Sequence, residues 1–306
     1  MTDEVSERHP HYWLGVLALV VCAAVWSLNG PLIKLIGQEG VGGVTIACYR
    51  SLIGGLVFAP LALRRLRTLR LVSPAWPIGS VLMFTLMTVC FVVATTKTAA
   101  ANAIILQYTS PIWVFLLSPL LLKEKPGWKE GLALLLALVG IGIIFSYHPT
   151  GEIVWLVVAL GSGLGYGTLT VTLRGLRRVN PFVVATMNAL GSGVILVMLV
   201  AASGTFAMTS RAWMLVILLS LVQFTLPYVL FSWALQRVEA YRAALIVLLE
   251  TLLNPLWTYL IIGERVPNAT LVGGPFILAG VITWLLLSWR RRQTLPISPT
   301  TAGDRQ

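Results

Sequence analysis

The sequence predicts an all-helical integral membrane protein with ten transmembrane helices. Of its 306 residues, 57% are hydrophobic and 11% are charged, and the mean hydropathy is +0.86. Soluble globular domains have about 25% charged residues, so this composition excludes an ordinary water-soluble fold. Ten mostly apolar stretches approach the roughly 20 residues that a helix needs to cross a bilayer. The segments that connect them are too short to hold a soluble domain.

Each apolar stretch is one predicted span. The spans are 13–35, 43–63, 76–96, 99–122, 130–147, 152–173, 181–202, 212–235, 240–262 and 268–289. The connecting segments 37–40, 64–70, 123–127 and 148–151 are polar or turn-like. Residues 1–12 contain three acidic side chains and precede a stretch of full spanning length, which is unlike a cleaved signal peptide.

The basic residues predict how the spans are oriented. The formal net charge is +11, from 22 Lys and Arg against 11 Asp and Glu. Alternating sides through ten spans puts 17 of the 22 on the side of the N-terminus and four on the other side, and leaves Arg50 inside a span. Cytoplasmic segments carry such an excess. We therefore expect the tails 1–12 and 290–306 to be cytoplasmic, and the charge requires no nucleic-acid partner.

The two halves of the chain resemble each other. At an offset of 140 residues, Ala100, Leu116, Glu124 and Gly140 match Ala240, Leu256, Glu264 and Gly280. With a shift of two residues, Leu52 and Gly55 match Leu190 and Gly193. These matches define two five-span repeats, 13–147 and 152–289. Five is an odd number, so the second repeat is predicted to be inverted. Inverted repeats are typical of transporters with a central site and access from alternate sides.

These features resemble a known family. Ten spans in two repeats, the Glu124-to-Gly140 and Glu264-to-Gly280 segments, and Trp26, Pro31 and Arg50 look like EamA-type exporters of the drug/metabolite transporter superfamily. Within it, the chain most resembles the bacterial exporters of aromatic and other neutral amino acids. The resemblance implies export across the bacterial inner membrane. One departure is Glu250-Thr251, where such helices often carry Glu-Pro.

Arg50 and Glu250 are the two charged side chains predicted well inside the spans. Burying either at mid-membrane costs roughly 2.5–3.5 kcal/mol on insertion scales, so such residues are functional candidates by default. Arg50 could bind a substrate carboxylate, and Glu250 could bind an ammonium group or carry a coupling proton. The alternatives are structural: Arg50 could cap helix-end carbonyls or extend to the surface, and Glu250 could hold a helix contact.

Aromatic and amide side chains inside the spans complete the candidate substrate site. Aromatic faces accept planar or apolar groups, and amides orient a polar end. The candidates are Trp26, Asn29, Tyr49, Tyr108, Tyr166, Asn188, Gln223, Tyr228 and Asn254. Packing or lipid contact is an equal alternative for each aromatic. Pro111, Pro119 and Pro255 are hinge candidates because each removes a backbone donor, although a kink needed only for packing is the competing interpretation.

The sequence predicts neither a metal site nor a cofactor. The glycine run 161–167 lies within a span without a preceding strand, so it indicates close helix packing rather than phosphate binding. An intramembrane enzyme would need a metal cluster or an acid–base pair, and one in-span Glu without an in-span His does not supply it. A structural protein would not need inverted repeats. The leading hypothesis is an amino-acid exporter in contact with lipid. The sequence is compatible with a monomer but does not report the oligomeric state. The alternative is an exporter of other small metabolites or drugs.

Overall fold

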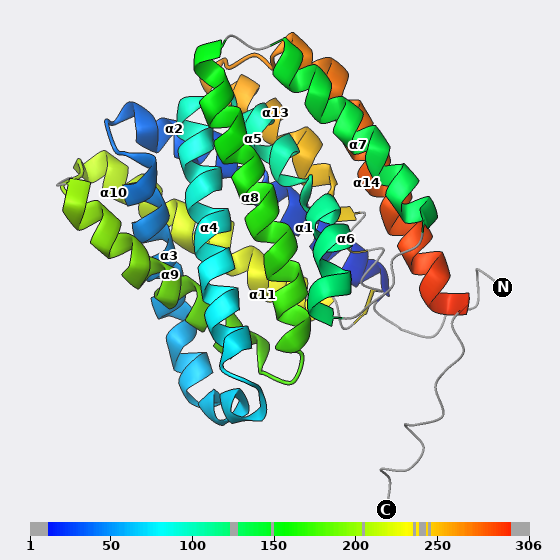
Figure 1. Ribbon diagram of the computed structural model, residues 1–306. Coiled ribbons are helices and arrows are strands. Elements are labelled where there is room, and N and C mark those ends of the chain that lie inside the picture. The colour runs from blue at the N-terminus through cyan, green and yellow to red at the C-terminus, as the bar shows by residue number, and fades with distance from the viewer. Residues whose placement is uncertain are drawn as a thin grey trace, which may run out of the picture.

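The computed structural model describes residues 12–122, 128–147, 150–203, 206–234, 237–238, 243 and 246–294. Within these ranges the chain is helical and contains no strand (Figure 1). The helices are α1 (Tyr12–Trp26), α2 (Asn29–Gln38), α3 (Gly43–Leu63), η1 (Leu66–Leu71), α4 (Ala75–Lys97), α5 (Ala100–Gln107), α6 (Ser110–Leu122), α7 (Trp128–Ser146), α8 (Thr150–Gly175), α9 (Pro181–Ser203), α10 (Ser210–Leu218), η2 (Leu219–Thr225), α11 (Leu226–Ala234), α13 (Leu249–Ile262) and α14 (Asn268–Thr294). Most of both predicted tails, and Glu124 in the 123–127 connection, lie outside the described residues.

Eight segments of the described chain are long and apolar enough to span a membrane. The first joins α1 and α2 over Tyr12–Gln38 and corresponds to the first predicted span, and the other seven agree with seven further predicted spans apart from their ends. The stretches 130–147 and 240–262 are not among the eight. In the former, the apolar part of the helix is Leu134–Ser146. In the latter, helix α13 has 14 residues. Large apolar side chains such as Leu120 and Met198 lie on the outside, as expected where lipid covers the surface.

Helices α3 and α9 show how the two halves relate. Leu52 of α3 contacts Gly193 of α9, and Leu190 of α9 contacts Gly55 of α3. Residue numbers rise along one helix as they fall along the other, so the two helices are antiparallel. Leu52 and Gly55 are the residues that match Leu190 and Gly193 between the repeats. The contact is therefore reciprocal, as it is across a two-fold axis.

The other helix pairs follow the same pattern. Helix α7 packs on α14, and these helices end the two repeats and run side by side in Figure 1. Helix α4 packs on α8, and α1 packs on α11. Helices α1 and α8 are in the first spans of the two repeats, and α4 and α11 are in the third spans. Exchanging the two halves therefore converts the contact of α1 with α11 into the contact of α8 with α4. The exchange thus preserves which spans are in contact, which agrees with an inverted repeat.

Two predicted spans are interrupted near their middle. The first breaks at Ser27 and Leu28, between α1 and α2, and the fourth breaks at Tyr108 and Thr109, between α5 and α6. Their polar side chains bond to the backbone: the Ser27 hydroxyl donates to the Ala24 carbonyl and the Thr109 hydroxyl to Leu106. A turn at Leu248, just before α13, lies 140 positions after Tyr108, so the two repeats are interrupted at matching positions.

The glycine run in α8 packs against two neighbours at once. A Cβ atom on Gly165 would lie 2.5 Å from the backbone nitrogen of Met87 in α4. On Gly163 it would lie 2.5 Å from the Thr109 hydroxyl, at the break between α5 and α6. Alternate glycines thus face different helices, and the predicted role in close packing is confirmed. This approach holds the interrupted fourth span against α8.

Candidate functional site

Arg50 is buried in the middle of the bundle, on α3. The residue is 6% exposed, and Nη1 donates to Oδ1 of Asn29, the first residue of α2, at 3.2 Å. The guanidinium carbon also lies 5.5 Å from the ring centroid of Phe224 in η2, a cation–π distance. An arginine has five N–H donors. Because a neutral amide and an aromatic face surround it, Arg50 retains both its charge and donors for a further acceptor.

Glu250 is buried in the first turn of α13. It is 9% exposed, and Oε2 accepts a hydrogen bond from the Tyr108 hydroxyl at 3.0 Å. Tyr108 lies at the break between α5 and α6, and Glu250 follows the matching turn at Leu248. The bond therefore joins the interrupted helices of the two repeats.

The two buried charges interact without pairing. Arg50 and Glu250 lie within electrostatic reach of each other, yet among the described residues no ion pair joins them. Each is instead bonded to a neutral side chain. The arrangement presents a cation and an anion, separated from one another, to one region of the bundle.

Aromatic rings surround this region on one side. Tyr228 of α11 lies 6.4 Å from Trp26, 6.1 Å from Phe58 and 5.8 Å from Phe224, measured between ring centroids. We call these four rings the aromatic wall. Tyr166 of α8 lies within electrostatic reach of both Glu250 and Tyr228, and the residue is 37% exposed. Tyr166 thus lies near Glu250 without being fully buried.

Helix η2 is a π-helix, and it brings two more side chains to the site. The Gln223 amide nitrogen donates to the Trp26 carbonyl at 3.2 Å, an acceptor near the break between α1 and α2. The Gln223 carbonyl oxygen is buried without a partner. The Thr225 hydroxyl bonds to the Ser220 carbonyl, five residues earlier. π-helical turns occur frequently at functional sites.

Among the described contacts, three predicted candidates are hydrogen-bonded to neither Arg50 nor Glu250. The Tyr49 hydroxyl donates to the Phe206 carbonyl, and its ring packs on Trp213. Asn188 accepts a bond from Ser80 between α4 and α9. Asn254 is fully buried, and its amide lies against Gly30 of α2 without a hydrogen-bond partner.

The hinge candidates occupy different positions in their helices. Pro111 is in the first turn of α6, directly after the break, where the missing N–H costs least. Pro119 and Pro255 lie inside α6 and α13. The interruption of the fourth span therefore coincides with Pro111. In the ninth it precedes Pro255 by seven residues.

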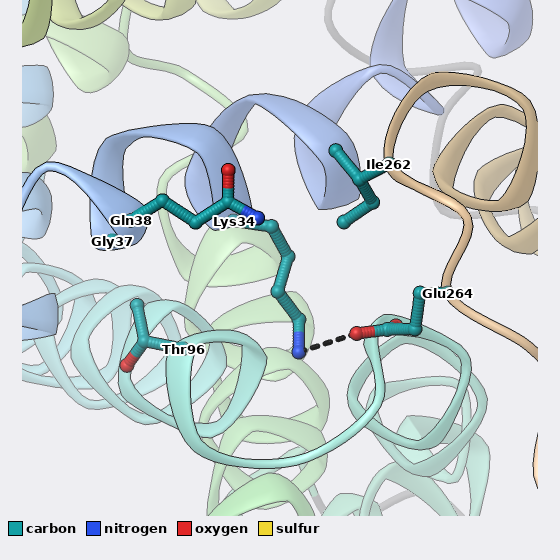
Figure 2. A pocket seen from close by; sticks show the side chains of 6 residues that line it. All are labelled: Lys34, Gly37, Gln38, Thr96, Ile262 and Glu264. Atoms are coloured by element: carbon teal, nitrogen blue, oxygen red, sulfur yellow. Dashed lines mark ion pairs between the residues drawn. The ribbon is translucent and has the colours of Figure 1, made fainter.

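The sequence did not single out Phe224, Phe58 or Lys34 as site residues. Phe224 and Phe58 occur within apolar runs, where no pattern distinguishes them from packing residues. Lys34 had a signal, because it is a cation near the end of a predicted span. It lines a pocket of about 340 Å³ with Gly37, Gln38, Thr96, Ile262 and Glu264 (Figure 2). No cluster of His, Cys, Asp or Glu that could hold a metal occurs within the described ranges.

Comparison with known proteins places the chain among membrane transporters. Residues 13–146 and 153–286 each match the EamA-like transporter family. An uncharacterized transporter of Archaeoglobus fulgidus is 30% identical, over 89% of this chain and 96% of that protein. The uncharacterized transporter YdfC of Bacillus subtilis is 25% identical, over 84% and 86%. A solved structure titled "Crystal structure of protein" shares the fold, with a TM-score of 0.62, 18% identity, and coverage of 92% of this chain and 99% of that one.

Proposed function

Because the chain belongs to the EamA-like transporter family, we propose that it exports amino acids from the cytoplasm, with aromatic and other neutral ones favoured. The observation that carries this proposal is the unpaired arrangement of Arg50 and Glu250. A zwitterionic amino acid has a carboxylate and an ammonium group on the same carbon atom. The carboxylate would replace Asn29 as the acceptor for Arg50, and the ammonium group would bind the Glu250 carboxylate.

The aromatic wall supports the preference for large neutral side chains. Phe224 contacts the Arg50 guanidinium, and Tyr228 joins it to Trp26 and Phe58. A side chain extending from a substrate held by Arg50 would therefore meet ring faces, which favour planar and apolar groups. The same wall would accept other planar metabolites or drugs, which is the alternative. The presence of both Arg50 and Glu250 favours the amino acid, because a ligand with one charge would leave the other buried charge without a charged partner.

We further propose alternating access between the repeats, in a bacterial inner membrane with both termini in the cytoplasm. The reciprocal packing of α3 on α9 supports this mechanism, because exchanging the conformations of two similar halves opens the opposite side. The distribution of the basic residues supports the orientation. Both repeats contribute to the site, Arg50 from the first and Glu250 from the second.

Transport by purified protein in liposomes tests the proposal. We expect counterflow of labelled phenylalanine and leucine, little of labelled succinate, and competition by unlabelled neutral amino acids. Arg50→Lys keeps the charge but loses the planar fork that binds a carboxylate, so it should raise the half-saturating concentration at least tenfold. Arg67→Lys, in the exposed η1, is the matched control. Transport of a dicarboxylate or a drug without any amino acid would refute the substrate assignment.

A further inference from the structure

Lys34 and Glu264 form an ion pair that connects three parts of the bundle. Lys34 Nζ lies 2.6 Å from Glu264 Oε2, and Figure 2 shows the two side chains pointing toward each other. The same ammonium group donates to the Thr98 carbonyl at 2.7 Å. The second carboxylate oxygen, Oε1, accepts from the Ala100 N–H at 2.8 Å. The pair therefore ties α2 to the turn between α4 and α5 and to the end of α13.

A second ion pair holds α2 at the same end. Glu39, directly after α2, lies 3.1 Å from Arg211 of α10 through Oε1. Its other oxygen accepts from the Thr209 hydroxyl at 2.9 Å. Charged contacts thus attach the end of α2 to neighbours on two sides. We call this end of the bundle the Lys34 face, and the basic-residue count predicts that it is external.

Helix α2 extends from the Lys34 face to the region of the two buried charges, Arg50 and Glu250. Its first residue, Asn29, bonds to Arg50, and Lys34 lies five positions later. The turn at Ser27 and Leu28 separates α2 from α1, so α2 can move without α1. In its first turn, Gly30 lies so close to Thr258 and Asn254 of α13 that α2 covers the inner part of α13 directly.

The pocket beside the pair is better suited to movement than to ligand binding. Both oxygens of Glu264 are already bonded, so the pocket offers no free carboxylate oxygen. The side chains of Lys34 and Glu264 are 17% and 23% exposed. An ion pair with this much contact with water contributes modestly and can break without a large penalty. The adjoining space of about 340 Å³ leaves room for the lysine to leave the glutamate.

We propose that α2 is the gate between the substrate site and the Lys34 face, and that the Lys34–Glu264 ion pair holds this gate closed. The inference rests on the proposed function only in assuming that access alternates. Opening moves α2 away from α13, which breaks the ion pair and uncovers Thr258. The described structure has this gate closed, because the ion pair is formed and Thr258 is 1% exposed.

A cysteine at position 258 reports the opening without any substrate. In a background with Cys22, Cys48 and Cys90 replaced by alanine, Thr258→Cys is exposed to a membrane-impermeant thiol reagent applied from the Lys34 face. We expect Lys34→Gln and Glu264→Gln each to raise the labelling rate about two- to fivefold, the range for a partly exposed ion pair. The double variant Lys34→Gln/Glu264→Gln should raise the rate no further than either single variant, because each single change already removes the ion pair.

Two controls separate gating from damage to the fold. Arg265→Gln removes the charge next to Glu264, has no ion pair among the described contacts, and should leave the labelling rate unchanged. The thermal midpoint of every variant is measured in parallel. Unchanged labelling in both single variants, or single effects that simply multiply in the double variant, would overturn the proposal. The labelling uses no amino acid, so failure of the substrate assignment would show only in the transport assay.

Discussion

Arg50 and Glu250 are each stabilised by a neutral neighbour although they lie within electrostatic reach of each other. The Asn29 amide supplies one acceptor to Arg50, and the Tyr108 hydroxyl supplies one donor to Glu250. A direct ion pair would neutralise both charges and would have to be broken to admit a charged ligand. The observed bonds are weaker, because a neutral partner contributes less than a charged one. They can therefore be exchanged for the charged groups of a substrate.

Glu250 is also the candidate for a coupling proton, and replacing its carboxyl by an amide tests this role. We expect Glu250→Gln to abolish the acceleration of transport by an imposed pH gradient, because an amide cannot take up or release a proton in this range. Counterflow without a gradient measures any separate effect on binding. Glu152→Gln at the start of α8 is the control and should keep the acceleration. An unchanged response in Glu250→Gln would exclude the proton role.

At the scale of the helices, interruption and close approach position these side chains. The breaks at Tyr108 and before Glu250 occupy matching positions in the two repeats. The π-helix η2 carries Phe224 to Arg50 in the second span and Gln223 to Trp26 in the first. Helix α8 lies against the broken fourth span because its glycines have no side chain. In a membrane, such packing replaces the hydrophobic driving force between helices.

The substitution Gly165→Ala, which adds one methyl group, should therefore destabilise the protein. Its Cβ would lie 2.5 Å from the backbone of Met87, and overpacking of this kind costs about 1–3 kcal/mol. Gly142 of α7 is the matched helical glycine, since a Cβ there meets nothing within 4 Å. Gly142→Ala should raise stability by up to about 1 kcal/mol. Thermal unfolding in one detergent compares the variants, and equal midpoints would contradict the packing argument.

At the scale of the whole molecule, the two halves pack as if related by a two-fold axis in the membrane plane. The reciprocal contacts of Leu52 with Gly193 and of Leu190 with Gly55 carry this symmetry to individual side chains. The substrate candidates break it. Arg50 of α3 has Asn188 as its match at the same offset of 138, and Glu250 matches Ser110 at 140. A symmetric scaffold thus carries an asymmetric pair of charges, as the proposed zwitterionic substrate would require.

The orientation of this scaffold is tested by labelling single cysteines in intact cells. Ser210→Cys lies on the exposed start of α10 at the Lys34 face, and Arg67→Cys lies in the exposed η1. With the native cysteines removed, an impermeant thiol reagent should label Ser210→Cys directly and Arg67→Cys only after permeabilisation. The opposite result would reverse the predicted topology, since Arg64, Arg65 and Arg67 would then lie outside.

Several features could be predicted from the residues alone, for identifiable reasons. Hydropathy located the membrane-spanning segments because a bilayer sets a minimum length for a spanning helix. Arg50 and Glu250 were conspicuous because charged residues are rare inside such segments. Hydropathy did not indicate that 13–35 and 99–122 are each two helices, because polar breaks such as Ser27 and Thr109 leave the average almost unchanged. Nor did it separate Tyr49, which packs on Trp213, from Tyr108, which bonds to Glu250.

The sequence by itself determined that this protein lies in a bilayer rather than in water. It also determined the approximate limits of most spans, the repeat and the two buried charges, because these depend on composition and order along the chain. Only the tertiary structure decided which side chains meet: Tyr108 with Glu250, Asn29 with Arg50, and Lys34 with Glu264. Those contacts depend on how each helix is rotated about its axis. A helix that is apolar on every side carries no periodic signal for that rotation, which is set instead by close contacts such as those of Gly163 and Gly165.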